Sequence, residues 1–246
     1  MIVSIAGTGN VGTHLAEAFN QQGIEIGKIL TRSSEAEAYR SAQLDSDVVL
    51  LAVSDSSISA VAGKFDPSFR DCIIAHTAGS IASTVLTHFT HYGVFYPLQT
   101  FTKGRPVNWS QIPILVTGSD REAELTLTKL ASNISSHVEI VDDRARLILH
   151  LSATIANNFS NHMFALAQEI VEKEGLDFDL LRPLIFETAL KVADLDPVDG
   201  QTGAARRNDQ VTMQKHLDLL SNDNELSDLY KIISASIRKS ATRSDV

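Results

Sequence analysis

The sequence has one cysteine, one tryptophan and no apolar run close to the roughly 20 residues that a membrane-spanning helix needs. A single cysteine excludes an internal disulfide, and the apolar surroundings of Cys72 indicate a small core residue, not a catalytic thiol. Basic residues are also few, with 21 Lys and Arg against 30 Asp and Glu, for a net charge of −9. This balance argues against a nucleic-acid partner, which would require a basic face.

The N-terminus begins directly in an apolar segment, without a basic stretch or a small-residue cleavage site. We therefore expect a cytoplasmic protein with no membrane partner. The length of 246 residues suggests one large domain or two modest ones, and a hydrophobic content of 43% is ample for a packed core.

Apolar segments and helical patterns alternate over the first 142 residues, which is typical of a doubly wound α/β fold. The apolar segments lack polar alternation, so we expect a mostly parallel sheet that is buried on both faces. The predicted strands are residues 2–6, 26–31, 48–53, 72–76, 94–96, 114–117 and 138–141. The predicted helices between them are residues 12–21, 34–43, 57–63, 82–89 and 120–132. Residues 101–112 interrupt the alternation and indicate a loop or a change of strand direction.

The strand pattern stops near Asp143, and the rest of the chain is helical. We predict helices at 144–173, 180–195, 209–220 and 225–241. The expected architecture is a Rossmann domain at 1–142, followed by an all-α domain for substrate binding and dimerisation at 143–246.

A glycine-rich loop with the spacing G-x-G-x-x-G joins the first predicted strand to the first helix. The spacing alone is common, but a strand before it and a helix after it are the context that dinucleotide binding requires. The amide groups at the start of that helix would face a pyrophosphate. The predicted cofactor residues here are Gly7, Thr8, Gly9, Asn10, Val11 and Gly12.

The end of the second predicted strand indicates which dinucleotide binds. NAD sites usually place an acidic residue about 20 residues past the glycines, and here Arg32 occupies that place. A guanidinium with the nearby hydroxyls of Thr31, Ser33 and Ser34 suits a 2′-phosphate, so we predict NADP(H).

The third predicted strand ends at the same edge of the sheet, where ligands of such folds bind. Its last residues, Ala52, Val53 and Ser54, should pass near the cofactor. We expect Asp55 to cap the following helix.

Several motifs extend a resemblance beyond the glycine loop. IAGTGNVG, TRS and LLAVSD resemble NADP-dependent reductases of the 6-phosphogluconate dehydrogenase-like group, which includes pyrroline-5-carboxylate reductase and deazaflavin-dependent NADP reductases. HTAGS, GVFYPLQTF, NNFSNH and TGAARRND are similar to oxidoreductases in which a Rossmann-like domain precedes a C-terminal domain of unknown function. The resemblance covers nearly the whole chain and implies this architecture and cofactor class, not a named reaction.

The long helix after Asp143 carries a polar stripe. At about 100° per residue, one side of the helix collects His150, Thr154, Asn157, Asn161 and Gln168. Such a stripe lines a site or forms a polar helix contact. The group that this chain resembles has a catalytic lysine on the corresponding helix, whereas no lysine lies between Lys129 and Lys173 here. His150 is the candidate replacement, with Asn157 and Asn158 as substrate-binding groups.

Two further residues are candidates for proton transfer at the sheet edge. His76 ends the fourth predicted strand and titrates in a useful range, although a structural histidine is an equal alternative. Tyr96 precedes Pro97 and can donate a proton, or it is a half-buried aromatic residue. His88 and His91 have metal-ligand spacing without further ligands, so no metal site is expected. Arg206 and Arg207 could bind a substrate anion or form surface ion pairs.

The leading hypothesis is an NADP(H)-dependent oxidoreductase that transfers hydride to or from a small keto acid or imine. The alternatives are a non-catalytic NADP sensor, which the missing lysine motivates, and a protein that binds another phosphorylated ligand. The apolar helical segments favour a homodimer formed through the C-terminal domain.

Overall fold

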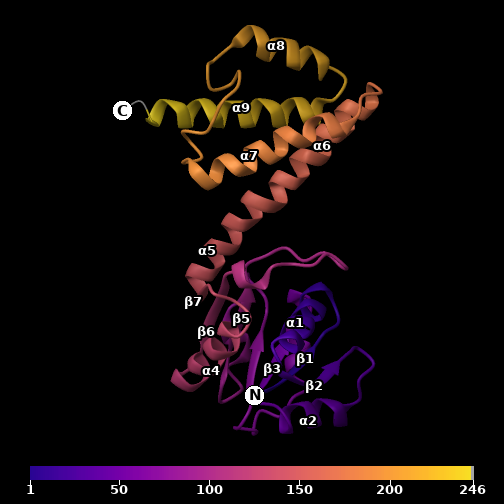
Figure 1. Cartoon of the computed structure of the whole chain (residues 1–246), viewed down its shortest axis with the longest axis vertical. Helices are drawn as coiled ribbons and strands as arrows, with labels where there is room; N and C mark the ends of the chain where they lie inside the picture. The colour runs from indigo at the N-terminus through magenta and orange to yellow at the C-terminus, as the bar shows by residue number, and fades with distance from the viewer. Residues whose placement is uncertain (245–246) are drawn as a thin grey trace. The chain divides into compact units, whose positions relative to one another are not determined.

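The computed structural model describes residues 1–244 and divides into two compact units, Met1–Met163 and Phe164–Val246. Figure 1 shows strands and helices in the first unit and only helices in the second. The fold expected from the sequence is confirmed: a Rossmann-like α/β unit is followed by a helical C-terminal region.

The first unit is built on a seven-stranded sheet with the order β2-β1-β3-β4-β5-β6-β7. All neighbouring pairs are parallel except β5 and β6, which pair in the antiparallel direction. The chain changes direction in residues 98–113, so the interruption predicted there is a change of strand direction. The strands are β1 (Ile2–Ala6), β2 (Glu25–Leu30), β3 (Val48–Leu51), β4 (Ile73–His76), β5 (Tyr92–Pro97), β6 (Ile114–Gly118) and β7 (Val138–Ile140).

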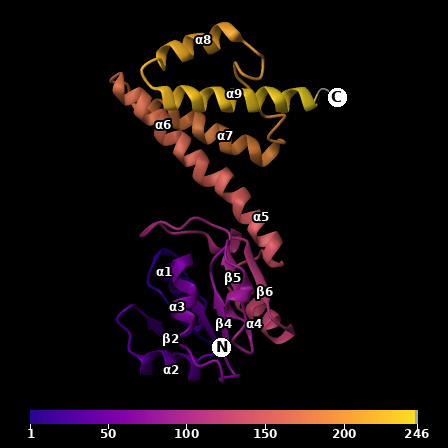
Figure 2. The same ribbon diagram turned by 180° about the vertical axis from the view of Figure 1, so that it is seen from behind.

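Helices cover both faces of this sheet, as the continuous apolar strands predict. Successive residues of β3 point to opposite faces: Val48 and Leu50 join one core, and Val49 and Leu51 join the other. The first core is completed by α1 (Asn10–Gln21) and α4 (Arg121–Ser132), and the second by α2 (Ala36–Leu44) and α3 (Ile58–Ala62). Figure 2 shows α1, α3 and α4 around the strands from behind.

Residues 82–89 were expected to form a helix, and this prediction was wrong in extent. The structure has a single 3₁₀ turn there, η2 (Ser83–Leu86). No side chain caps this turn, and the Ser83 amide donates to the Asp143 carboxylate at 3.0 Å. A tertiary contact therefore satisfies the amide that begins the turn.

The helical region starts where the strand pattern stops. Helix α5 (Asp143–Ala153) passes through a π-helical segment, η4 (Thr154–Phe159), into α6 (Ser160–Lys173), so the boundary between the two units falls within one helical run. The second unit continues with η5 (Phe178–Leu181), α7 (Arg182–Asp194), α8 (Gln210–Leu219) and α9 (Asn224–Ser244). No helix among residues 1–244 is long and apolar enough to cross a membrane.

Candidate cofactor and active site

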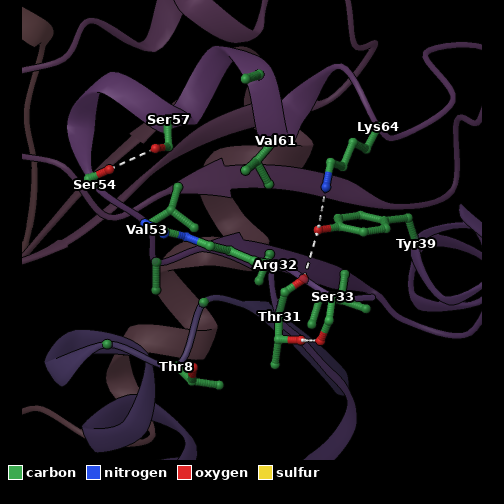
Figure 3. A pocket seen from close by; sticks show the side chains of 16 residues that line it. Thr8, Thr31, Arg32, Ser33, Tyr39, Val53, Ser54, Ser57, Val61 and Lys64 are labelled. Atoms are coloured by element: carbon green, nitrogen blue, oxygen red, sulfur yellow. Dashed lines mark hydrogen bonds between the residues drawn. The ribbon is translucent and has the colours of Figure 1, made fainter. Parts of the chain in front are cut away.

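A cavity of about 670 Å³ lies where β1, β2 and β3 end, at the carboxyl edge of the sheet. Figure 3 shows the side chains around it. No carboxylate is among the lining residues, which are Ala6, Gly7, Thr8, Gly9, Leu30, Thr31, Arg32, Ser33, Tyr39, Ala52, Val53, Ser54, Ser57, Ala60, Val61 and Lys64. The position and the charge of this cavity both suit an anionic ligand.

The three glycines of the loop differ in their surroundings. Gly7 has a φ of +121°, and a Cβ there would lie 2.1 Å from the Ala52 carbonyl oxygen. A Cβ at Gly12 would lie 2.2 Å from the Gly7 carbonyl oxygen, whereas a Cβ at Gly9 would meet no atom within 4 Å. Gly7 and Gly12 are therefore required by the fold, and Gly9 leaves open space for a ligand to approach the backbone.

The start of α1 has free hydrogen-bond donors. Gly9 is its N-cap, no side chain caps the helix, and the first turn contains no acidic residue. Asn10, Val11 and Gly12 form that first turn, next to the cavity but outside its lining. Their amides and the helix dipole form an environment that favours a phosphate group.

The guanidinium of Arg32 is available to bind a ligand. No ion pair or side-chain hydrogen bond to another described residue occupies its guanidinium, and Figure 3 shows the side chain reaching across the cavity toward Val53. Hydroxyl groups order the turn around it: the Thr31 and Ser33 hydroxyls lie 2.9 Å apart, and Ser34 Oγ accepts from the Thr31 amide at 2.9 Å. Ser34 supports this turn without lining the cavity.

The sequence interpretation missed a second cation in this cavity. Lys64 Nζ donates to the Tyr39 hydroxyl at 3.3 Å and lies 4.7 Å from the centre of the Tyr39 ring. The Tyr39 hydroxyl in turn donates to the Thr31 carbonyl at 3.3 Å (Figure 3). The signal was a basic residue two positions after α3, but only the folded chain places Lys64 in the same cavity as Arg32.

Tyr96 and His150 meet at the end of β5. The Tyr96 hydroxyl lies 3.0 Å from His150 Nδ1, and the two rings pack edge to face at 5.8 Å. A Cβ on Gly79 would lie 2.6 Å from His150 Nδ1 and 2.7 Å from Tyr96 Cζ. These two predicted catalytic residues therefore form one pair, and the glycine of the HTAGS motif is what allows it.

Burial is the main cause that raises the pKa of Tyr96, and the nearby Asp55 carboxylate adds to the shift. The phenol thus keeps its proton at neutral pH. A phenol oxygen can accept a hydrogen bond from an imidazole N–H. Where the Tyr96 hydroxyl accepts from Nδ1–H of His150, that proton stays on Nδ1, so Nε2 has the lone pair that can take up a proton and release it again.

Asp55 does not cap the helix after β3, so that prediction was wrong. It is the first residue of η1 (Asp55–Ser57), and its carboxylate accepts from Ser80 Oγ at 2.5 Å. The contact joins the ends of β3 and β4 beside Tyr96.

His76 is not part of the Tyr96–His150 pair. The residue is completely buried, and its Nδ1 accepts from the Ala78 amide at 3.2 Å. Burial, followed by the charge of Arg146, lowers the pKa of the imidazole to about 4. The side chain is therefore neutral at pH 7 and out of contact with solvent, which favours the structural alternative for His76.

A buried arginine fixes the helix that carries His150. Arg146 is one turn before His150, its side chain is 1% exposed, and it donates to Asp143 and Thr117 at 2.7 Å and to the Ile81 carbonyl at 2.5 Å. Burial would raise the pKa of Asp143, but hydrogen bonds from Ser83 and Arg146 lower it below the usual value. The ionised pair anchors α5 to β6 and to the residues after β4.

Asn157 and Asn158 lie in η4 and line a second, separate cavity together with Asn161 and residues of the 99–112 segment. Neither side chain hydrogen-bonds to the Tyr96–His150 pair, and neither member of that pair lines this cavity. The polar stripe predicted for this helix therefore contributes to two places, with His150 at the pair and the asparagines at the second cavity.

The other residues considered in the sequence are the histidines with metal-ligand spacing, Cys72, and the arginine pair Arg206 and Arg207. Among residues 1–244 no group of three or more His, Cys, Asp or Glu side chains could hold a metal ion. His91 pairs with Asp120 at 2.9 Å, and burial raises the pKa of the Cys72 thiol to about 12. Arg206 and Arg207 belong to the second unit, between α7 and α8.

A family described as a domain of unknown function, DUF2520, matches residues 112–237. The chain belongs to this family. The resemblance drawn from the sequence motifs is thus confirmed at the level of the family. No curated protein matches the chain.

Solved structures extend the comparison. A Bacteroides fragilis protein, provisionally described as an NADP oxidoreductase, is 36% identical over 97% of this chain and 98% of its own, with a TM-score of 0.87. A Thermotoga maritima protein is 21% identical over 99% and 100% of the two chains, with a TM-score of 0.75. A reductive aminase from Aspergillus terreus, in complex with NADPH and ethyl levulinate, is 15% identical over 98% and 93%, with a TM-score of 0.73. The last two likenesses show the shared fold.

Proposed function

We propose that this member of the DUF2520 family is an NADP(H)-dependent oxidoreductase. One observation carries the proposal: the cavity at the carboxyl edge of the sheet contains two cations, Arg32 and Lys64, and no carboxylate. An NAD site would place an acid on the ribose hydroxyls here, and that acid would repel a 2′-phosphate. The NADP oxidoreductase described for the Bacteroides fragilis relative and the NADPH bound to the reductive aminase support the same cofactor.

The chain's residues fit this cofactor group by group. The α1 amides and the open face of Gly9 would hold the pyrophosphate. Arg32, Lys64 and the hydroxyls of Thr31 and Ser33 would bind the 2′-phosphate. Ala52, Val53 and Ser54 would lie along the nucleotide at the end of β3.

The bound nicotinamide would exchange hydride with a carbonyl or imine carbon of a small substrate. His150 would move the proton at Nε2 while Tyr96 keeps Nδ1 bound, and Gly79 leaves room for both side chains. Because Tyr96 stays protonated, it positions the imidazole and does not act as the base.

Fluorescence titration with NADPH and NADH tests the cofactor. We expect the wild type to bind NADPH more tightly, and Arg32→Ala and Lys64→Ala to reduce that preference by roughly tenfold each, as for loss of a charge-assisted contact. Lys28→Ala is the matched control, because Lys28 lies on β2 outside the cavity. Equal affinity for the two nucleotides in the wild type would refute the assignment.

No lysine lies between Lys129 and Lys173, where the resembling enzymes have a catalytic one, and this favours the second candidate, a sensor of the NADP redox state that performs no chemistry. A sensor should bind NADPH and NADP⁺ with very different affinities and should not oxidise NADPH with any keto acid or imine. Turnover by the wild type that is lost in His150→Asn would favour the enzyme over the sensor.

We further propose a homodimer formed through the helical region. Within residues 164–241 the buried apolar side chains are Ala205 and Met213 alone, whereas Leu184, Phe186 and Leu190 are each more than 60% exposed. A surface this apolar needs a partner, and a second copy supplies the same complementary face. Light scattering should give twice the chain mass, and Phe186→Glu should shift it toward the monomer.

A further inference from the structure

A second cavity, of about 620 Å³, lies within the first unit, between the segment after β5 and the π-helical turn η4. Its chemistry differs from that of the cofactor cavity, because amides dominate it. It is lined by Gln99, Thr100, Thr102, Arg105, Pro106, Val107, Asn108, Gln111, Ile112, Asn157, Asn158 and Asn161. Arg105 is the only charged residue in this list.

One helical run contributes three amides to this cavity, two of them from its π-helical turn. Asn157 and Asn158 are consecutive, and both line the cavity together with Asn161 in the next turn. Segments of π-helix are rare and frequently occur at functional sites. None of these three amide side chains hydrogen-bonds to another described residue, so their donors are free for a bound molecule.

Arg105 has a fixed backbone and a free side chain. Its carbonyl oxygen lies 3.0 Å from His14 Nε2, and its amide donates to the Thr102 carbonyl at 3.1 Å. The side-chain amide of Asn10, in α1, also holds this segment by donating to the Phe101 carbonyl at 2.8 Å. The segment runs over α1 in Figures 1 and 2. The guanidinium of Arg105, by contrast, has no ion pair and no hydrogen bond within residues 1–244.

We propose that this cavity binds the carboxylate of the substrate, with Arg105 as its ionic partner and the asparagines of η4 as further donors. The substrate class is then a small oxo acid or imino acid. A free guanidinium among amides, with no carboxylate nearby, favours an anion and disfavours an amine cation. A neutral, apolar substrate would instead require mostly apolar walls, whereas Pro106, Val107 and Ile112 are the only apolar residues in this lining. The inference rests on the proposed oxidoreductase function, because it names the substrate of that reaction.

Arg105 also lines a smaller cavity beside Thr8, Gly9 and Asn10, where the pyrophosphate would lie. The experiment must therefore separate a contact with the substrate from a contact with the cofactor. Lys103 makes this separation feasible, because it lines that smaller cavity and not the amide-rich one.

The test uses the full chain saturated with NADPH and pairs of probes that differ in one charge: levulinate with ethyl levulinate, and pyruvate with methyl pyruvate. Affinities are measured by ligand-observed NMR at constant ionic strength. We expect the free acids to bind at least about tenfold more tightly than the esters, as for a charged hydrogen bond. Arg105→Ala should remove this preference while the NADPH dissociation constant changes less than about twofold, and Lys103→Ala should retain it. Asn157→Asp, which adds a like charge, should weaken acid binding more than ester binding.

Equal binding of acids and esters by the wild type would overturn the proposal, and so would the absence of binding by every probe. Weakened NADPH binding in Arg105→Ala with the acid preference intact would assign Arg105 to the pyrophosphate instead. Failure of the wild type to bind NADPH would refute the proposed function. The acid and ester titrations repeated without cofactor would then still show whether the amide-rich cavity selects a carboxylate.

Discussion

One methyl group added at Gly79 should strongly impair the proton transfer proposed for His150. In Gly79→Ala the new Cβ would lie 2.6 Å from His150 Nδ1, where ordinary contacts begin at 3.4 Å. The imidazole must therefore move by about 0.8 Å, the difference between these two distances. A misplacement of about 1 Å in a catalytic group can cost roughly 100-fold in rate. We expect turnover to fall between about tenfold and 100-fold, with NADPH affinity unchanged because Gly79 does not line the cofactor cavity.

Two assays check this prediction, and the first needs no substrate. The side-chain ¹⁵N shifts of His150 should change in Gly79→Ala in the same sense as in Tyr96→Phe, because both variants lose the bond to Nδ1. The second is turnover of whichever acid or imine is reduced by the wild type. Gly63→Ala is the matched control, since a Cβ at Gly63 meets no atom nearer than 3.6 Å. Unchanged His150 shifts and full turnover in Gly79→Ala would refute the assignment of the Tyr96–His150 pair.

Three further predictions concern stability. Arg146→Met should lower the free energy of unfolding by about 3 kcal/mol, because it leaves the Asp143 carboxylate without its buried partner; a loss under about 1 kcal/mol in urea denaturation would contradict this. Burial holds the pKa of His76 at about 4 in the folded chain against 6.5 when unfolded, so stability is complete above about pH 6.5 and falls by about 3 kcal/mol as the pH drops to 4. Urea titrations at several pH values should show this slope, and His76→Asn should flatten it. Asp120→Ala removes the N-cap that accepts from the Glu122 and Ala123 amides, and thermal denaturation should show a loss of about 1 kcal/mol.

Most of the fold could be predicted from local patterns. All seven strands and the long helices lie within a few residues of their predicted places, because strands buried on both faces leave continuous apolar runs. The strand order and the antiparallel pairing of β5 with β6 required the structure, since both depend on where residues 98–113 run in space.

The sequence likewise identified some residues of the candidate site, and only the structure identified the others. Arg32 could be identified because the glycine loop and the end of the second strand have a known spacing. Lys64 could not, because its place in the same cavity as Arg32 depends on how α3 packs against the sheet. Arg146 was likewise unremarkable in the sequence, although its contacts with Thr117 and Ile81 make it the most deeply buried charged side chain of residues 1–241.

Local chemistry along the chain therefore determined the class of fold, the glycine loop and the positive charge at the end of β2. Each of these depends on residues close together in sequence, whose periodicity and backbone freedom can be read directly. Tertiary structure alone decided that Tyr96 meets His150 across 54 positions of the chain, that His76 is buried, and that the asparagines of η4 face a different cavity. Those outcomes depend on packing between distant segments and on desolvation, neither of which local sequence specifies.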